Sequence, residues 1–158
     1  MNSITAEKDF PSAKNFVYLN AANVSLMYSG AKNGIQDWFD DVALNGSNNF
    51  DDNAEQNVFK NLHLAAARLI NTSPDNIAAG SSATELLGSL AWAVLPTKNQ
   101  NVVSTKIVFP STVYPWQRVA NSTGCEIRLA KEKNNFVDVD DIIDLIDENT
   151  KVVCISHV

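Results

Sequence analysis

Hydrophobic residues recur at helical intervals over much of the first half of the chain. From about Ser29 to Ala43 the apolar positions fall three or four residues apart, which predicts a helix. A second helix is predicted from Asn53 to Ile70, where apolar side chains again share one face and the run 72–75 ends the pattern. The polar run 45–49 between the two helices, which contains a glycine, predicts a loop.

The second half of the chain alternates between β-prone and helical patterns. Three short β-prone runs, 102–104, 126–129 and 152–156, have centres about 25 residues apart, with helical patterns at 112–123 and 138–147 between them. A crossover helix between parallel strands needs such an interval. We therefore expect an α/β fold with a mostly parallel, buried sheet and flanking helices.

A further helix is predicted after Gly80, and Pro96 ends it. Because this helix is apolar nearly all round, we expect it to be buried. The turn before it, where Gly80 is followed by small and hydroxylated residues up to Glu85, has two interpretations. It is either an ordinary capped helix, with Ser81 or Ser82 as the N-cap and Glu85 completing a capping box, or a seat for a phosphate at the positive end of the helix dipole.

Composition narrows the possible partners and location. The chain has 158 residues, about one domain by length, and a formal net charge of −6, which argues against nucleic acid and anionic membrane surfaces as partners. Residues 1–10 do not form a secretory signal, and no apolar run is long enough to span a bilayer. Two cysteines without a CxxC pair indicate buried structural thiols in a reducing compartment, which we expect to be the cytoplasm, and two histidines do not make a metal-binding cluster.

Four stretches, in order along the chain, resemble the N-terminal part of class V aminotransferases, the fold-type-I PLP enzymes that include cysteine desulfurases. The run 18–25 (YLNAANVS) is similar to the opening signature of that family, and 64–88 is similar to its helix and phosphate turn. The run 109–116 (FPSTVYPW) resembles the EHxSxxxPW element, and 150–158 (TKVVCISHV) resembles a strand written TKLVxxSHV. The resemblance covers almost the whole chain.

The resemblance implies pyridoxal 5′-phosphate (PLP) as cofactor and assigns roles to particular residues. Ala83 and Thr84 would hold the phosphate through a backbone amide and a hydroxyl, and Ser82 would assist them. Phe109 stands where the family often has a histidine stacked on the cofactor ring, so it is either the ring platform or a core residue. The turn 20–23 lines the substrate side or is a plain turn.

The resemblance also implies residues that this sequence does not contain. In the family, the lysine that forms a Schiff base with PLP, the aspartate on its ring nitrogen and the arginine for the substrate carboxylate all lie beyond the position that matches Val158. No lysine of the chain matches the Schiff-base motif, so we assign no catalytic residue.

We therefore expect residues 1–50 to be an N-terminal segment and helix, and 51–158 to be a truncated part of the PLP-binding large domain. The expected function is that of the N-terminal part of an enzyme acting on an amino acid, inactive as this chain alone. Its expected partner is a second copy of the chain or the remainder of the same protein. The alternative is a non-catalytic remnant or interaction protein that retains a phosphate-binding turn.

Overall fold

The computed structural model describes residues 7–156, which belong to two compact units that meet in sequence between Ile77 and Ala78. The uncertainly placed residues are 1–6 and 157–158, so the start of the chain and the last two positions of the TKVVCISHV stretch lie outside the described residues. The compact units differ from the predicted division at residues 50 and 51, which concerns the domains of a longer protein. That division stays a prediction.

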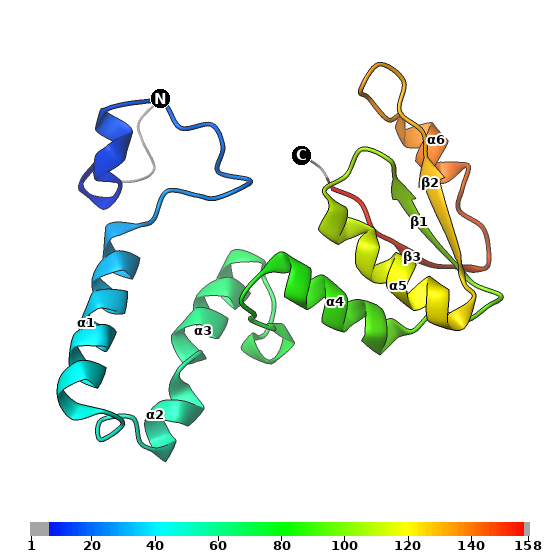
Figure 1. The fold of residues 1–158 in the computed structure, drawn as a ribbon. Helices are drawn as coiled ribbons and strands as arrows, with labels where there is room; N and C mark the ends of the chain where they lie inside the picture. The colour runs from blue at the N-terminus through cyan, green and yellow to red at the C-terminus, as the bar shows by residue number, and fades with distance from the viewer. Residues whose placement is uncertain (1–6, 157–158) are drawn as a thin grey trace. The chain divides into compact units, whose positions relative to one another are not determined.

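The first unit is helical (Figure 1). Its elements are η1 (Glu7–Asp9), η2 (Pro11–Lys14), α1 (Ser29–Asn45), α2 (Asp52–Asn57), α3 (Lys60–Leu69) and η3 (Pro74–Asn76). The prediction of α1 is confirmed, but the single helix predicted over 53–70 was wrong, because α2 and α3 are separate helices. The side-chain amide of Asn57 donates to the backbone carbonyl of Asn53 at 2.7 Å, and such local bonds compete with the continuing helix.

The second unit is an α/β layer structure. Its elements are α4 (Ala83–Val94), β1 (Asn101–Thr105), η4 (Pro110–Thr112), α5 (Tyr114–Thr123), β2 (Glu126–Ala130), α6 (Val139–Ile143) and β3 (Thr150–Val153). The strands form one sheet in the order β2-β1-β3, and both pairings are parallel. The predicted parallel sheet is therefore confirmed.

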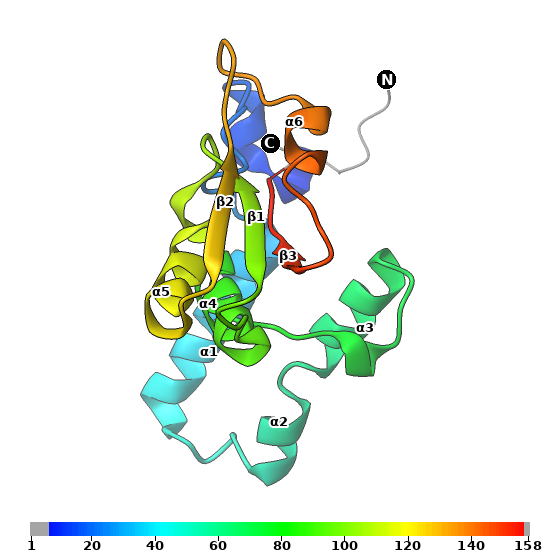
Figure 2. The ribbon, with the colours of Figure 1, turned by 90° about the vertical axis from the view of Figure 1, so that its right-hand side faces the viewer.

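The two crossover helices lie on opposite faces of this sheet. The chain moves from β1 outward to β2 and then back past β1 to β3, so right-handed connections place α5 and α6 on different sides. Figure 2 shows this separation, with α4 on the same side as α5. The face that carries α4 and α5 is the one that bears the candidate site.

The core of the second unit is centred on β1, whose five residues are all buried. Ala91 of α4, Val102 of β1 and both Trp116 and Val119 of α5 form its hydrophobic cluster. The expectation that α4 is buried all round was wrong. Only Ala91 of that helix is buried, because a single face of α4 packs on this cluster, and Leu90 is 50% exposed.

A polar network joins the strands at the edge where β1 and β3 begin. The Arg128 guanidinium donates to Asp147 Oδ2 at 2.7 Å, and the Asn101 side-chain amide donates to Asp147 Oδ1 at 2.9 Å. These contacts lower the pKa of Asp147 from 3.8 to about 2. The hydrogen bond from Arg128 is the main cause, and the one from Asn101 is the next. The network therefore fixes the end of the sheet at which β1 and β3 begin. The candidate site lies at the other end, beyond the carboxyl end of β1.

Two smaller observations concern the residues in 7–156. Cys125 is buried and Cys154 is half-buried, and both are free thiols. No helix in this range is both long enough and apolar enough to cross a bilayer.

Replacing the central indole tests the core. Trp116 is 1% exposed, so Trp116→Ala removes a large buried side chain and is expected to lower the free energy of unfolding by about 3–5 kcal/mol, as measured by urea denaturation. Trp92, 46% exposed on α4, is the matched control, and Trp92→Ala should cost much less. Equal losses for the two variants would contradict this core assignment.

The Asp147 network predicts a pH-dependent stability. Because the folded pKa of Asp147 lies below its ordinary value of 3.8, the stabilisation is complete above about pH 4 and is lost as the pH falls towards 2. Asp147→Asn should therefore lower the thermal midpoint at pH 7, and its difference from wild type should shrink between pH 4 and 2. The exposed neighbour Glu148 provides the control, since Glu148→Gln should show no such trend.

Candidate cofactor-binding site

The turn before α4 is built as a helix cap. Ser82 is the N-cap residue in an extended conformation, and its Oγ accepts a hydrogen bond from the Glu85 backbone N–H at 3.2 Å. Glu85 Oε2 accepts from Ser81 twice, from its backbone N–H at 2.7 Å and from its hydroxyl at 2.6 Å. The predicted capping box is therefore present in modified form, because Glu85 reaches the residue before the N-cap.

Gly80 allows this turn to close tightly. A Cβ atom at Gly80 would lie 2.8 Å from Leu86 Cδ2 and 2.9 Å from Leu86 Cγ, so the Leu86 side chain would have to move. The glycine thus allows the chain to pass directly over the first turn of α4.

The cap leaves donors available at the start of α4. The first N–H groups of a helix, in α4 those of Ala83 and Thr84, have no carbonyl partner within the helix. They lie at the positive end of the helix dipole, which favours an anion. The Glu85 carboxylate accepts hydrogen bonds from Ser81, chiefly from the serine hydroxyl and then from the backbone N–H, and these bonds lower the pKa of Glu85 below its ordinary value.

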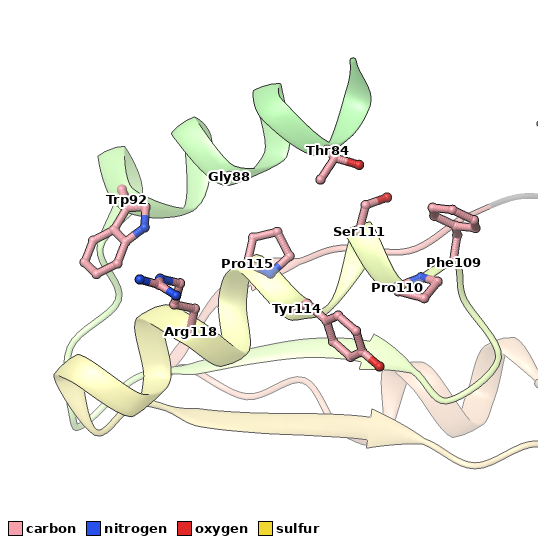
Figure 3. A pocket seen from close by; sticks show the side chains of 9 residues that line it. All are labelled: Thr84, Gly88, Trp92, Phe109, Pro110, Ser111, Tyr114, Pro115 and Arg118. Atoms are coloured by element: carbon pink, nitrogen blue, oxygen red, sulfur yellow. The ribbon is translucent and has the colours of Figure 1, made fainter. Parts of the chain in front are cut away.

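One face of α4 forms a wall of a groove of about 420 Å³ (Figure 3). Thr84, Gly88 and Trp92 are spaced four residues apart and so line the same face of the helix. The opposite wall comes from η4, its preceding residue and α5, and consists of Phe109, Pro110, Ser111, Tyr114, Pro115 and Arg118. Among residues 7–156, Arg118 is the only charged residue that lines the groove, although the chain as a whole is acidic.

The structure brings two of the four predicted cofactor-binding residues into this groove. Thr84 and Phe109 both line it, whereas Ser82 and Ala83 belong to the same helix start but not to the lining. Phe109 is 68% exposed, so the alternative that it is a core residue was wrong. Its platform role and the phosphate roles of Ser82, Ala83 and Thr84 remain predictions.

The sheet positions Phe109 at this site. β1 ends at Thr105, and Phe109 follows as the N-cap residue of η4, beyond the carboxyl end of the strand. Ligands of open α/β sheets bind outside the carboxyl ends of the strands, so this is the expected edge for a cofactor. The polar network of Asp147 lies at the other end of β1, against Asn101.

Sequence reasoning missed two residues of the groove, Ser111 and Arg118. In the sequence Ser111 is one residue of the run 109–116 and has no feature of its own that indicates a role. From the sequence alone, Arg118 is interpreted as a surface charge. The four-residue spacing of Tyr114 and Arg118 on a predicted helix was a usable signal for one shared face. Ser111 lies in a 3-10 turn, where neither helical nor strand periodicity indicates the direction of a side chain.

The donor set fits the phosphate of PLP. Backbone N–H groups at the start of α4 and the hydroxyl of Thr84 are neutral donors of the kind that a phosphate dianion accepts. No carboxylate of the described residues lines the groove, and Glu85 is held against Ser81. The Phe109 ring offers an exposed aromatic face at the same end of the groove, as Figure 3 shows.

Comparison with curated proteins gives relatives that are longer than this chain. A probable cysteine desulfurase of Ureaplasma parvum is 28% identical over 149 residues, which cover 91% of this chain and 37% of that protein. The uncharacterised aminotransferase YcbU of Bacillus subtilis is 24% identical, over 94% of this chain and 39% of that protein. This chain thus spans less than two fifths of the length of these relatives.

Solved structures show the same fold over a similar share. A mutant of C-DES, described as having glycine covalently linked to its PLP cofactor, superposes with a TM-score of 0.78 at 20% identity, covering 97% of this chain and 41% of that one. An apo cysteine desulfurase from Thermococcus onnurineus gives a TM-score of 0.69 at 19% identity, covering all of this chain and 42% of that one. The fold is that of part of a PLP-dependent enzyme.

A family model described as aminotransferase class-V matches residues 17–158, which include the capped turn, the groove and all three strands. The chain belongs to the class-V aminotransferase family and corresponds to an N-terminal portion of such an enzyme.

Proposed function

We propose that this chain supplies the phosphate seat and the ring platform of a PLP-dependent enzyme that acts on an amino acid. The observation that carries the proposal is that Thr84 and Phe109 line one groove although 25 positions separate them in the sequence. Family membership and the fold support the same cofactor, since the C-DES structure contains PLP by its own description.

Each residue has a distinct task in this proposal. The amides of Ala83 and Thr84 and the Thr84 hydroxyl bind the phosphate, and Ser82 assists while it caps the helix. Phe109 covers one face of the pyridine ring and keeps water from that face. When bound, PLP supplies an electron sink for bonds at the substrate α-carbon.

Phe109 also bears on the type of reaction. A phenyl ring provides stacking but has no nitrogen to hold or move a proton, unlike the histidine that the family often has at this position. We therefore propose a general aminotransferase-like activity rather than a desulfurase that relies on that histidine. The relatives include proteins named as aminotransferases as well as probable cysteine desulfurases.

The remaining parts of the proposal concern partners and location. The lysine that binds PLP covalently would come from the remainder of the same protein or from a second chain, and we propose a homodimer as the complete form. The acidic charge and the two free thiols are in keeping with a reducing cytoplasm as its compartment.

Loss of one hydroxyl tests the phosphate seat. Thr84→Val keeps the shape of the side chain but removes a donor to a charged group, so we expect PLP affinity to fall about ten-fold or more. Titration with PLP and with pyridoxal, which lacks the phosphate, measures the effect, and only PLP binding should change. Thr97→Val, at an exposed position after α4, is the control. Equal affinity of the wild-type chain for PLP and pyridoxal would refute the phosphate seat.

Covalent trapping tests the absence of a catalytic lysine from this chain. No lysine in the part of the chain that the structure describes lines the groove, and none of the nine lysines in the sequence matches the family's covalent position. We expect borohydride treatment with equimolar PLP to give no stoichiometric adduct in an intact mass spectrum. A stoichiometric adduct on one lysine would show that this prediction is wrong.

A further inference from the structure

Ser111 lies near Thr84 and Phe109, two of the four predicted cofactor-binding residues (Figure 3). It is half-buried in η4 and lines the groove together with Thr84 and Phe109. Figure 3 shows the hydroxyl groups of Thr84 and Ser111 at the same end of the groove, near the Phe109 ring. The Ser111 hydroxyl is therefore on the wall of the groove opposite α4. It faces the region at the start of α4 where an anion would bind.

The turn that carries Ser111 is well fixed. Pro110 restricts its first position, and the backbone N–H of Thr112 donates to the Phe109 carbonyl at 2.9 Å. The N–H of Val113 donates to the Pro110 carbonyl at 3.1 Å. Thr112 is buried while Ser111 lines the groove, so the turn directs the two neighbouring side chains differently.

The Ser111 hydroxyl has no structural role in the described part of the chain. Within residues 7–156 it makes no hydrogen bond to the protein, whereas the hydroxyls of Ser81, Ser82 and Ser104 each bond to a partner. A half-buried hydroxyl without a protein partner is available to a ligand. Since none of the described lining residues carries a carboxylate, such a hydroxyl acts as a donor to an anion.

We propose that Ser111 is a further phosphate-binding residue, whose hydroxyl donates to a phosphate oxygen from the wall opposite α4. This inference rests on the proposed function, because it takes the phosphate at the start of α4 to be that of PLP. The amides of α4, the Thr84 hydroxyl and the Ser111 hydroxyl then approach the phosphate from two walls. The tetrahedral group is thereby fixed in orientation, and the ring is held against Phe109.

The experiment compares two ligands on matched variants of the full chain. PLP and pyridoxal are titrated by calorimetry into the wild-type chain, Ser111→Ala and Ser111→Cys. We expect Ser111→Ala to weaken PLP binding about ten-fold or more and to leave pyridoxal binding unchanged, with Ser111→Cys intermediate because a thiol is a weak donor. Ser89→Ala is the control, since Ser89 is exposed on α4 and lies outside the groove lining.

The outcomes separate this inference from the proposed function. If the wild-type chain binds PLP no better than pyridoxal, the phosphate seat itself fails and Ser111 has no phosphate to bind. If wild type prefers PLP and Ser111→Ala binds PLP equally well, the Ser111 role alone is overturned.

An equal loss of PLP and pyridoxal affinity in Ser111→Ala would also overturn the Ser111 role, because it would indicate a ring contact or a distorted turn. Thermal unfolding midpoints identify a distorted turn. Binding of inorganic phosphate, monitored by phosphorus NMR in competition with PLP, gives a second readout. Ser111→Ala should weaken the binding of inorganic phosphate about as much as it weakens the binding of PLP.

Discussion

The parallel pairing of β1 with a strand on each side is the constraint on which the second unit depends. Parallel strands cannot be joined by a tight hairpin, so the connections to β2 and β3 must be crossovers that contain α5 and α6. Because β2 and β3 lie on opposite sides of β1, the two helices cover opposite faces. All three strands also end at the same edge, and the segment after β1 carries Phe109 and Ser111 to that edge.

The capped turn before α4 shows how one short segment meets two demands. A helix start must satisfy its free N–H groups, and an anion site must leave some of them available. Ser82 satisfies the N–H of Glu85, and the Glu85 carboxylate is engaged by Ser81. The amides of Ala83 and Thr84 are thereby left for a ligand, so capping and phosphate binding are compatible rather than alternative interpretations of the same residues.

Most of α4 is exposed, although its sequence predicted that it would be buried. Its apolar residues surround the helix, but the described residues cover only the face that includes Ala91. An apolar pattern reports that burial would be favourable and does not say which element provides it. Apolar periodicity also failed to show where α2 ends and α3 begins, because the periodic pattern continues across the break. The break is favoured locally by the hydrogen bond from Asn57 to Asn53.

The sequence by itself determined the class of fold, the order of the strands and crossover helices, and the capped turn, because periodicity, spacing and capping chemistry are local properties. The bounds were less exact, since the strand expected at 152–156 is Thr150–Val153 and the helix expected at 138–147 is Val139–Ile143. Motif order along the chain was enough to indicate the family and to name Thr84 and Phe109. Only the tertiary structure decided that these two residues share a groove, that Phe109 is exposed, and that Ser111 and Arg118 line the same groove. The reason is physical: the packing of α4 against η4 and α5 sets which faces meet, and residues distant in sequence carry no local record of that contact.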